Sequence, residues 1–223
     1  MDSVFATLNT STDILVEKLK NHPVILNTVT EHLFKFLEQR SLIASSEYLA
    51  LKMLDDASCH LEPDLNKMME SYRAMKKGNT VPDIEFDRDM KAPAYTYSNK
   101  PKRLSEVHSK YKVVVFGASW CPQCPNDLYE IAKYYASWKQ QGVEVVFVSL
   151  DEDKHAFEKF TRPFPFISIC DYQKWETKAV QDYHVFATPT IYLLNSKHEI
   201  ILKPRSIHQL NAWVDWYLEK GNK

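Results

Sequence analysis

The spacing of apolar residues divides the chain into two parts. Residues 12 to 77 carry apolar side chains at helical intervals. One helical face of this part consists of Leu26, Val29, Leu33, Phe36 and Leu37. No internal repeat of solenoid length is visible, and Gly78 follows the last helical pattern. We therefore predict an all-helical region over residues 1–80, which packs beside the rest of the chain or selects its partners.

From residue 81 onward, short β-branched or aromatic runs alternate with helical patterns. These runs cover residues 113–116, 143–148, 166–170, 190–194 and 199–202. Strand, helix and strand at this spacing predict parallel strands joined by right-handed crossovers. The last two runs are too close for a crossover, so we expect an antiparallel hairpin between them. Residues 81–223 are thus predicted to form an α/β domain with a mixed sheet flanked by helices.

Composition narrows the classes of function. The formal net charge is −1, so charge gives no reason to expect a nucleic acid or an anionic membrane as partner. The four glycines are too far apart to form a phosphate-binding loop. No apolar run is long enough to span a bilayer, and the polar N-terminal stretch shows no signal peptide.

The candidate chemistry is a pair of closely spaced cysteines, Cys121 and Cys124, between the 113–116 run and a helical pattern. The N-terminus of a helix carries partial positive charge and unpaired N–H groups, which stabilise a thiolate. In such a pair the first thiolate attacks a disulfide of a partner, and the second resolves the mixed disulfide. We expect Cys121 to be solvent accessible and Cys124 to be shielded.

Three other uses of the pair are less consistent with the sequence. A zinc site needs about four ligands, but Cys59 and Cys170 are isolated and the histidines form no cluster. A structural disulfide across so short a loop adds little stability. A peroxidase of this fold needs a lone cysteine in a threonine-containing turn, whereas Gly-Ala-Ser-Trp precedes Cys121. We expect a redox pair, no metal, no cofactor, and unpaired buried thiols at the other two cysteines.

Two stretches of the chain, VVVFGASWCPQCPNDL and VFATPTIYLL, resemble the thioredoxin fold and, more narrowly, the TlpA/ResA-like thiol–disulfide oxidoreductases of bacterial envelopes. The resemblance covers residues 81 to about 220. It implies that Cys121 is the nucleophile and Cys124 the resolving thiol of a redox-active disulfide. It also implies a substrate-binding surface composed of Trp120, Pro122, Thr188 and Pro189, with Pro189 in the place of the family's cis-proline.

Asp127 stands where the family carries a carboxylate that assists proton transfer from the thiols. The alternative is that Asp127 only stabilises the first turn of a helix. The sequence also departs from the family at Pro125, which lacks an N–H that the Cys121 carbonyl needs if the helix begins at Cys121.

Two local features complete the predictions. The run Asp-Glu-Asp-Lys after the 143–148 strand predicts a helix start, with Asp151 or Ser149 as its cap. His198 lies in the predicted hairpin, where histidine is among the residues that tolerate a left-handed backbone.

Taken together, these features predict a dithiol–disulfide oxidoreductase that reduces disulfides of envelope proteins. The resemblance implies that its partners are proteins with a disulfide or dithiol, including an upstream electron donor, and that it acts in the bacterial periplasm or cell envelope. Two alternatives remain open. One is a chaperone-like disulfide isomerase that holds clients with the helical region, and the other is a redox-inactive binding module of the same fold.

Overall fold

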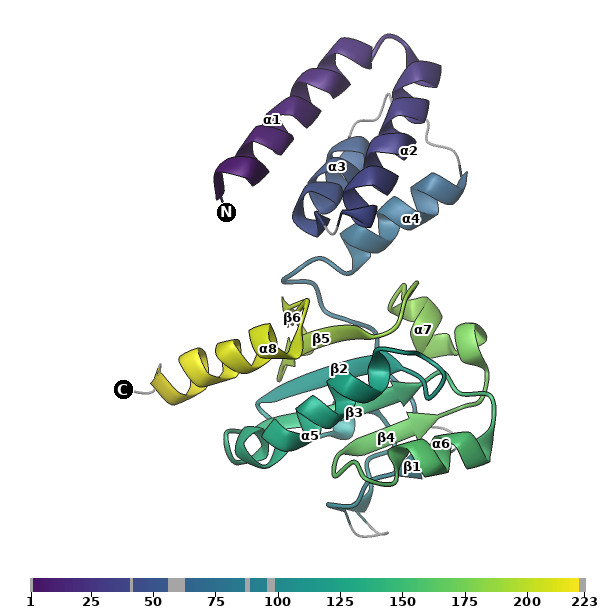
Figure 1. Ribbon diagram of the computed structural model, residues 1–223, viewed down its shortest axis with the longest axis vertical. Coiled ribbons are helices and arrows are strands. Elements are labelled where there is room, and N and C mark those ends of the chain that lie inside the picture. Colours follow the sequence, from purple (N-terminus) through teal and green to yellow (C-terminus); the bar gives the residue numbers. More distant parts are fainter. Residues whose placement is uncertain (1, 41, 56–62, 87–88, 96–98, 221–223) are drawn as a thin grey trace. The chain divides into compact units, whose positions relative to one another are not determined.

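We analysed a computed structural model of the 223-residue chain. The structure describes residues 2–40, 42–55, 63–86, 89–95 and 99–220. The chain forms two compact units, Met1–Lys76 and Lys77–Lys223 (Figure 1). Cys59, which we predicted to be a buried thiol on a helix, lies outside the described residues.

The first unit is helical, as predicted. Its helices are α1 (Asp2–Leu19), α2 (Pro23–Gln39), α3 (Ile43–Asp55) and α4 (Pro63–Ala74). The predicted core face of α2 is partly wrong, because Phe36 is 48% exposed whereas Phe34 and Thr30 are buried. Successive helical residues are about 100° apart, so Phe34 and Phe36 point to nearly opposite sides. Packing selects the side that carries Leu26, Thr30, Phe34 and Leu37.

The second unit contains a six-stranded mixed sheet. Its strands are β1 (Asp89–Lys91), β2 (Tyr111–Gly117), β3 (Val143–Ser149), β4 (Ile167–Cys170), β5 (Thr190–Asn195) and β6 (Ile200–Leu202). The order is β1-β4-β3-β2-β5-β6. Strands β2, β3 and β4 are parallel, whereas β5 and β6 form the predicted antiparallel hairpin. Strand β1 was not predicted, because three residues are too few to show an alternating pattern.

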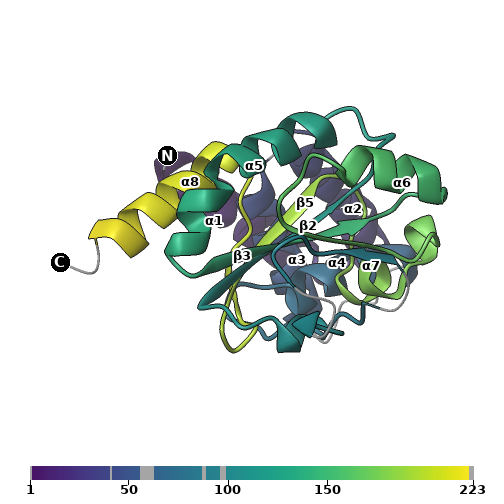
Figure 2. The same ribbon diagram turned by 90° about the horizontal axis from the view of Figure 1, so that it is seen from below.

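Helices cover both faces of this sheet. They are α5 (Cys124–Gln140), α6 (Lys154–Thr161), α7 (Lys178–Asp182) and α8 (Ile207–Val214), the last continuing into a π-helical segment, Asp215–Lys220. Figure 2 shows α5, α6 and α8 on one face and α7 on the other. Val115 and Phe147 pack toward α5, whereas Phe116 contacts the rings of Tyr183 and Tyr192 on the second face. Burial on both faces explains why the central strands are almost continuously apolar.

The second unit begins with a segment that pairs with the sheet edge. Gly78 N–H donates to the Ile200 carbonyl at 2.8 Å, and Ile200 N–H donates to the Asn79 carbonyl at 2.8 Å. Val81 N–H donates to the His198 carbonyl at 2.9 Å. His198 has the predicted left-handed backbone, with φ +62°. Residues 78–81 therefore contribute hydrogen bonds to the sheet whose strand β2 leads to the cysteine pair.

The predicted cap of α6 is wrong. Asp153 caps this helix, because its side chain accepts a hydrogen bond from Ala156 N–H at 2.8 Å. Ser149 still belongs to β3, and Asp151 is buried with other partners. The chain needs two more residues to leave the sheet before the helix can begin, which places the capping position at the third residue of the run.

Candidate active site

The cysteine pair lies where β2 leads into α5. Cys121 and Cys124 form a disulfide, with their Cα atoms 5.4 Å apart. Helix α5 begins at Cys124, and the Cys124 N–H donates to Cys121 Sγ at 3.3 Å. The free N–H groups of a helix start stabilise negative charge. In the reduced protein this geometry favours a thiolate on Cys121.

Both sulfur-bearing residues are buried in this disulfide form. Cys124 is 1% exposed and is shielded as predicted, whereas Cys121 is 3% exposed, so its predicted accessibility is not found in this form. Residues distant in sequence help to cover the pair, because Cys121 Sγ lies 3.4 Å from the Thr188 carbonyl oxygen. Trp120, Pro122 and Gln123 are exposed beside the disulfide.

Pro125 does not cost the helix a hydrogen bond. Because α5 begins at Cys124 rather than at Cys121, Pro125 occupies the first helical turn. An N–H at that position has no partner inside the helix, so proline is well tolerated there. The concern that the Cys121 carbonyl loses a helical partner therefore does not apply.

The segment before β5 faces the disulfide. The Thr188–Pro189 peptide bond is cis, and both residues are partly exposed. Phe186, two residues earlier, is 59% exposed. The structure thus brings Thr188 and Pro189 beside Cys121, across 67 positions of sequence.

Gly117 provides space for the disulfide and was missed as a site residue. It is the last residue of β2, and an added Cβ would lie 3.0 Å from Cys124 Sγ and 3.1 Å from the Phe147 ring. Both contacts are tighter than ordinary van der Waals packing, so any larger residue must displace one of them. A single glycine at a strand end is a weak sequence signal, and only the packing shows its purpose.

Trp120 belongs to an aromatic surface beside the disulfide. It is 45% exposed, and its Nε1–H donates to the Leu150 carbonyl at 3.4 Å. The Trp175 ring lies 6.1 Å away between centroids, and Lys174 Nζ lies 5.6 Å from the centre of the Trp120 ring. Trp175 was also missed, because it comes from a 3₁₀ turn, Lys174–Glu176, more than 50 positions along the chain.

Asp127 lies in the first turn of α5 and is partly buried. Its carboxylate accepts a hydrogen bond from Gln123 Nε2 at 2.9 Å. Gln123 is one of the two residues between the cysteines. The carboxylate thus contacts the inter-cysteine segment, at a position that also stabilises the helix start.

A cluster around Asp151 supports the loop that precedes Cys121. Asp151 Oδ1 accepts hydrogen bonds from Ser119 N–H at 3.1 Å and from Ser119 Oγ at 2.6 Å. Asp151 Oδ2 accepts from Ser149 Oγ at 2.7 Å. The sequence indicated only a helix cap at this position, because these partners come from two different strand ends.

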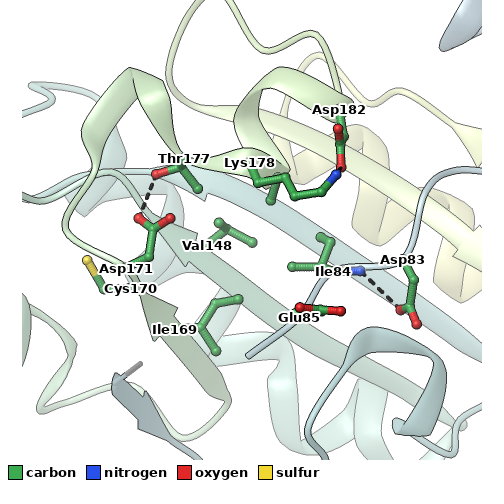
Figure 3. A pocket seen from close by; sticks show the side chains of 11 residues that line it. Asp83, Ile84, Glu85, Val148, Ile169, Cys170, Asp171, Thr177, Lys178 and Asp182 are labelled. Carbon is green, nitrogen blue, oxygen red and sulfur yellow. Dashed lines mark hydrogen bonds and ion pairs between the residues drawn. The ribbon is translucent and has the colours of Figure 1, made fainter. Parts of the chain in front are cut away.

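The second face of the sheet contains a cavity of about 120 Å³ (Figure 3). Ile84, Val148 and Ile169 form its apolar floor, and Asp83 and Lys178 are among the polar residues around it. Neither Cys121 nor Cys124 lines this cavity. The cysteine pair and this cavity are therefore separate candidate sites.

Cys170, at the end of β4, is a free thiol that is only 4% exposed. Its Sγ donates to the Asp151 carbonyl oxygen at 3.3 Å. Burial raises the pKa of Cys170 to about 11, so this thiol remains protonated at neutral pH.

Neither a metal site nor a membrane-spanning helix is found among the described residues. Among them, no three His, Cys, Asp or Glu side chains are grouped so that they could hold a metal ion. Over the same ranges, none of the helices has the length and apolar character needed to cross a membrane.

Comparison with known proteins links this site to a family. A family model described as the AhpC/TSA family matches residues 77–203. The thiol-disulfide oxidoreductase ResA of Geobacillus kaustophilus is 29% identical over 129 residues, which cover 57% of this chain and 68% of that protein. ResA of Bacillus subtilis is 29% identical over 140 residues, which cover 61% and 71%. The sporulation thiol-disulfide oxidoreductase A of Bacillus subtilis is 24% identical over 153 residues, covering 64% and 85%.

Solved structures share the fold. A thioredoxin-like protein from Bacteroides caccae has a TM-score of 0.70 at 18% identity, covering 94% of this chain and 76% of that one. The thioredoxin domain of a thiol-disulfide oxidoreductase from Bacteroides vulgatus has a TM-score of 0.53 at 18% identity, covering 64% and 97%. The second unit therefore has the thioredoxin-like fold that the sequence predicted.

Proposed function

Because the chain belongs to the AhpC/TSA family, we propose that it is a dithiol–disulfide oxidoreductase whose redox pair is Cys121 and Cys124. The observation that carries the proposal is the hydrogen bond from Cys124 N–H to Cys121 Sγ at the start of α5. Through this bond the positive end of the helix lies beside Cys121 Sγ. Cys121 Sγ is the sulfur that must carry a negative charge to attack.

The proposed reaction has two exchange steps. In the first, the Cys121 thiolate forms a bond to one sulfur of a partner disulfide, the partner S–S bond breaks, and the other partner sulfur leaves as a thiolate. In the second, the Cys124 thiolate attacks Cys121 Sγ, the mixed disulfide breaks, and the partner leaves with both sulfurs reduced. The protein is then oxidised, and a dithiol of an upstream electron-donor protein returns two electrons to it.

Other residues near the pair are assigned supporting roles. We assign Asp127 the role of accepting the proton of Cys124 before the second step, directly or through water. Thr188 and Pro189 are proposed to pair with an extended segment of the partner, as a short added strand. Trp120 and Pro122 supply exposed apolar surface for the same segment.

We further propose that the reaction takes place in the bacterial periplasm or cell envelope, where protein disulfides persist. Support for this location is the resemblance to TlpA/ResA-like proteins. Cell fractionation followed by thiol trapping of Cys121 and Cys124 tests it, because a protein confined to the cytosol would contradict the proposed location.

Reduction of a model disulfide protein such as insulin tests the activity. We expect Cys121→Ser to abolish reduction driven by a small dithiol, and Cys124→Ser to accumulate a mixed disulfide. Cys170→Ser is the matched control, because Cys170 is a buried free thiol outside the pair. If Cys121→Ser reduces insulin as fast as the parent, the proposal is wrong, and the redox-inactive binding module is the better description.

Exposed apolar side chains on the helical unit support a second candidate, the chaperone-like isomerase. Val24 is 79% exposed, Ile25 52% and Ile14 51%. A holding function needs such surface, because unfolded clients bind through apolar contacts. Suppression of client aggregation by the full chain, lost in a fragment of residues 77–223, would favour this candidate. Equal suppression by both would contradict a role for the helical unit.

A further inference from the structure

We propose that Asp151 is a positioning residue that holds the loop before Cys121 and that its buried charge makes the Cys121 thiol less acidic. The inference rests on the proposed function of the Cys121–Cys124 pair. It adds a second electrostatic influence on this pair, which opposes that of the helix start.

The side chain of Asp151 faces three hydrogen-bond donors. Asp151 is 1% exposed, and both of its side-chain oxygens accept hydrogen bonds. The donors are Ser119 N–H, Ser119 Oγ and Ser149 Oγ. An ionised carboxylate accepts at both oxygens, and a buried charge is tolerated only when it has such partners.

The backbone of Leu150, the residue before Asp151, makes hydrogen bonds with the loop on both sides of Ser119. Leu150 N–H donates to the Gly117 carbonyl at 2.8 Å, and Trp120 Nε1–H donates to the Leu150 carbonyl at 3.4 Å. Ser119 lies between Gly117 and Trp120 and donates hydrogen bonds to Asp151. Cys121 follows two residues later, so a shift of this loop moves the nucleophilic sulfur.

Other ionisable groups around the loop are more exposed or are neutral. Lys174 is 40% exposed at its side chain and pairs at 2.8 Å with Glu152, which is 61% exposed. Asp127, at the start of α5, is partly exposed. On β4, the Cys170 thiol remains protonated at neutral pH. Solvent screens the exposed charges, whereas a charge that is buried acts over a longer distance.

A buried negative charge disfavours a second negative charge nearby. It therefore raises the pKa of the Cys121 thiol, whereas the helix start lowers it. The Ser119 hydroxyl donates to Asp151 and disperses its charge. Loss of the charge and loss of this hydroxyl should consequently shift the acidity of Cys121 in opposite directions, and a purely structural role predicts no such reversal.

The experiment is the pH dependence of Cys121 alkylation by iodoacetamide in reduced full-length protein carrying Cys124→Ser, with the label assigned by peptide mass. We expect Asp151→Asn, which keeps the side-chain shape, to lower the apparent pKa of Cys121. Below that pKa the alkylation rate should rise about threefold to tenfold. Ser119→Ala should raise the apparent pKa and slow alkylation in the same pH range.

Asp171→Asn is the matched control. Asp171 follows β4 and accepts from Gln173 N–H at 3.0 Å and from Thr177 Oγ at 2.7 Å (Figure 3). These donors are also a backbone amide and a hydroxyl, but neither belongs to the loop before Cys121. The profile of Asp171→Asn should superimpose on that of the parent.

Superimposable profiles for Asp151→Asn and the parent would overturn the inference, as would shifts of equal sign in Asp151→Asn and Ser119→Ala. If Asp151→Asn does not fold, Ser119→Ala decides alone: a raised pKa supports the inference and an unchanged one overturns it. Alkylation needs no partner protein, so it distinguishes this inference from the proposed function. A parent protein that fails to reduce insulin contradicts the function, while the alkylation profiles still test Asp151.

Discussion

An acidic residue lies near each end of strand β3, and the two residues have different partners. Glu144, near its first residue, is fully buried and forms an ion pair with Lys139. Asp151, two residues past its end, has hydroxyl and amide partners instead. Glu144 also accepts from Tyr135 at 2.8 Å and from Tyr95 at 3.3 Å.

The different partners of Glu144 and Asp151 indicate different roles for the two residues. Lys139 compensates the Glu144 charge, and the ion pair joins α5 to the sheet far from the disulfide. Burial and the Glu144 charge raise the pKa of Tyr95 to about 12, so its hydroxyl remains a donor at neutral pH. Asp151 has no ion-pair partner among the described residues, and it holds the loop before the redox pair, where a buried carboxylate can influence a thiol. Equal burial thus serves stability at one end and thiol chemistry at the other.

The largest effect on stability is expected at Glu144, near the start of β3. Glu144→Ala leaves the Tyr135 hydroxyl without its acceptor and Lys139 without its anion. We expect a loss of about 2–4 kcal/mol in the free energy of unfolding. Urea denaturation measures this loss, and insulin reduction by the remaining folded protein should match the parent. Glu144→Gln, which keeps the shape, should lose less. A reduction rate that falls in folded Glu144→Ala would contradict the division of roles.

Beside the disulfide, at the end of β2, Gly117→Ala should affect both the free energy of unfolding and the exchange reaction. The added methyl group contacts Cys124 Sγ and the Phe147 ring. We expect a loss of about 1–3 kcal/mol from overpacking, together with slower resolution of the mixed disulfide. Quenched-flow trapping with a labelled partner peptide follows this second step.

Gly78→Ala is the control for the preceding variant. Gly78 has φ +94° with open space around its Cα, so alanine there is strained but does not clash. It should lower stability by about 1 kcal/mol and leave resolution unchanged. Normal resolution in Gly117→Ala would show that the disulfide end tolerates the added volume.

Cys170 offers a test of burial beside Asp151. Its folded pKa of about 11 exceeds the ordinary value of 9.0, so the unfolded chain loses this proton first as pH rises. The stabilising contribution is therefore complete below about pH 9 and is lost as pH rises toward 11. Cys170→Ala should make the stability of the protein less dependent on pH over this window, as measured by urea denaturation. Parallel pH profiles for variant and parent would contradict a raised pKa.

The smallest effect is expected at Asp127. If it accepts the Cys124 proton, Asp127→Asn should slow resolution roughly twofold to tenfold and leave the first attack by Cys121 intact. Loss of the helix-start charge should lower stability by about 0.3–1 kcal/mol. The pH dependence of mixed-disulfide decay measures the first effect, with Gln123→Ala as the control for the contact between the two side chains. Equal decay rates in mutant and parent would leave Asp127 a role in the helix alone.

The sequence by itself determined the elements with strong local patterns. The apolar runs over 113–116 and 143–148 lie within β2 and β3, because a strand buried on both faces must be apolar along its length. The short link before residue 199 required a hairpin, because no crossover fits in so few residues. The pair Cys121 and Cys124 was visible because its spacing and its place before a helical pattern are both local.

Only the tertiary structure decided which residues meet across the chain. It placed Thr188 against Cys121, gave Asp151 its partners from two strand ends, and filled the space beside Gly117 with Cys124. It also buried Phe34 in place of Phe36, since both sides of α2 offer apolar residues and packing selects one. Such contacts join segments tens of residues apart, and the free energy that selects them comes from burial and hydrogen bonding in the assembled fold. A local pattern of hydrophobic and polar positions does not contain that information.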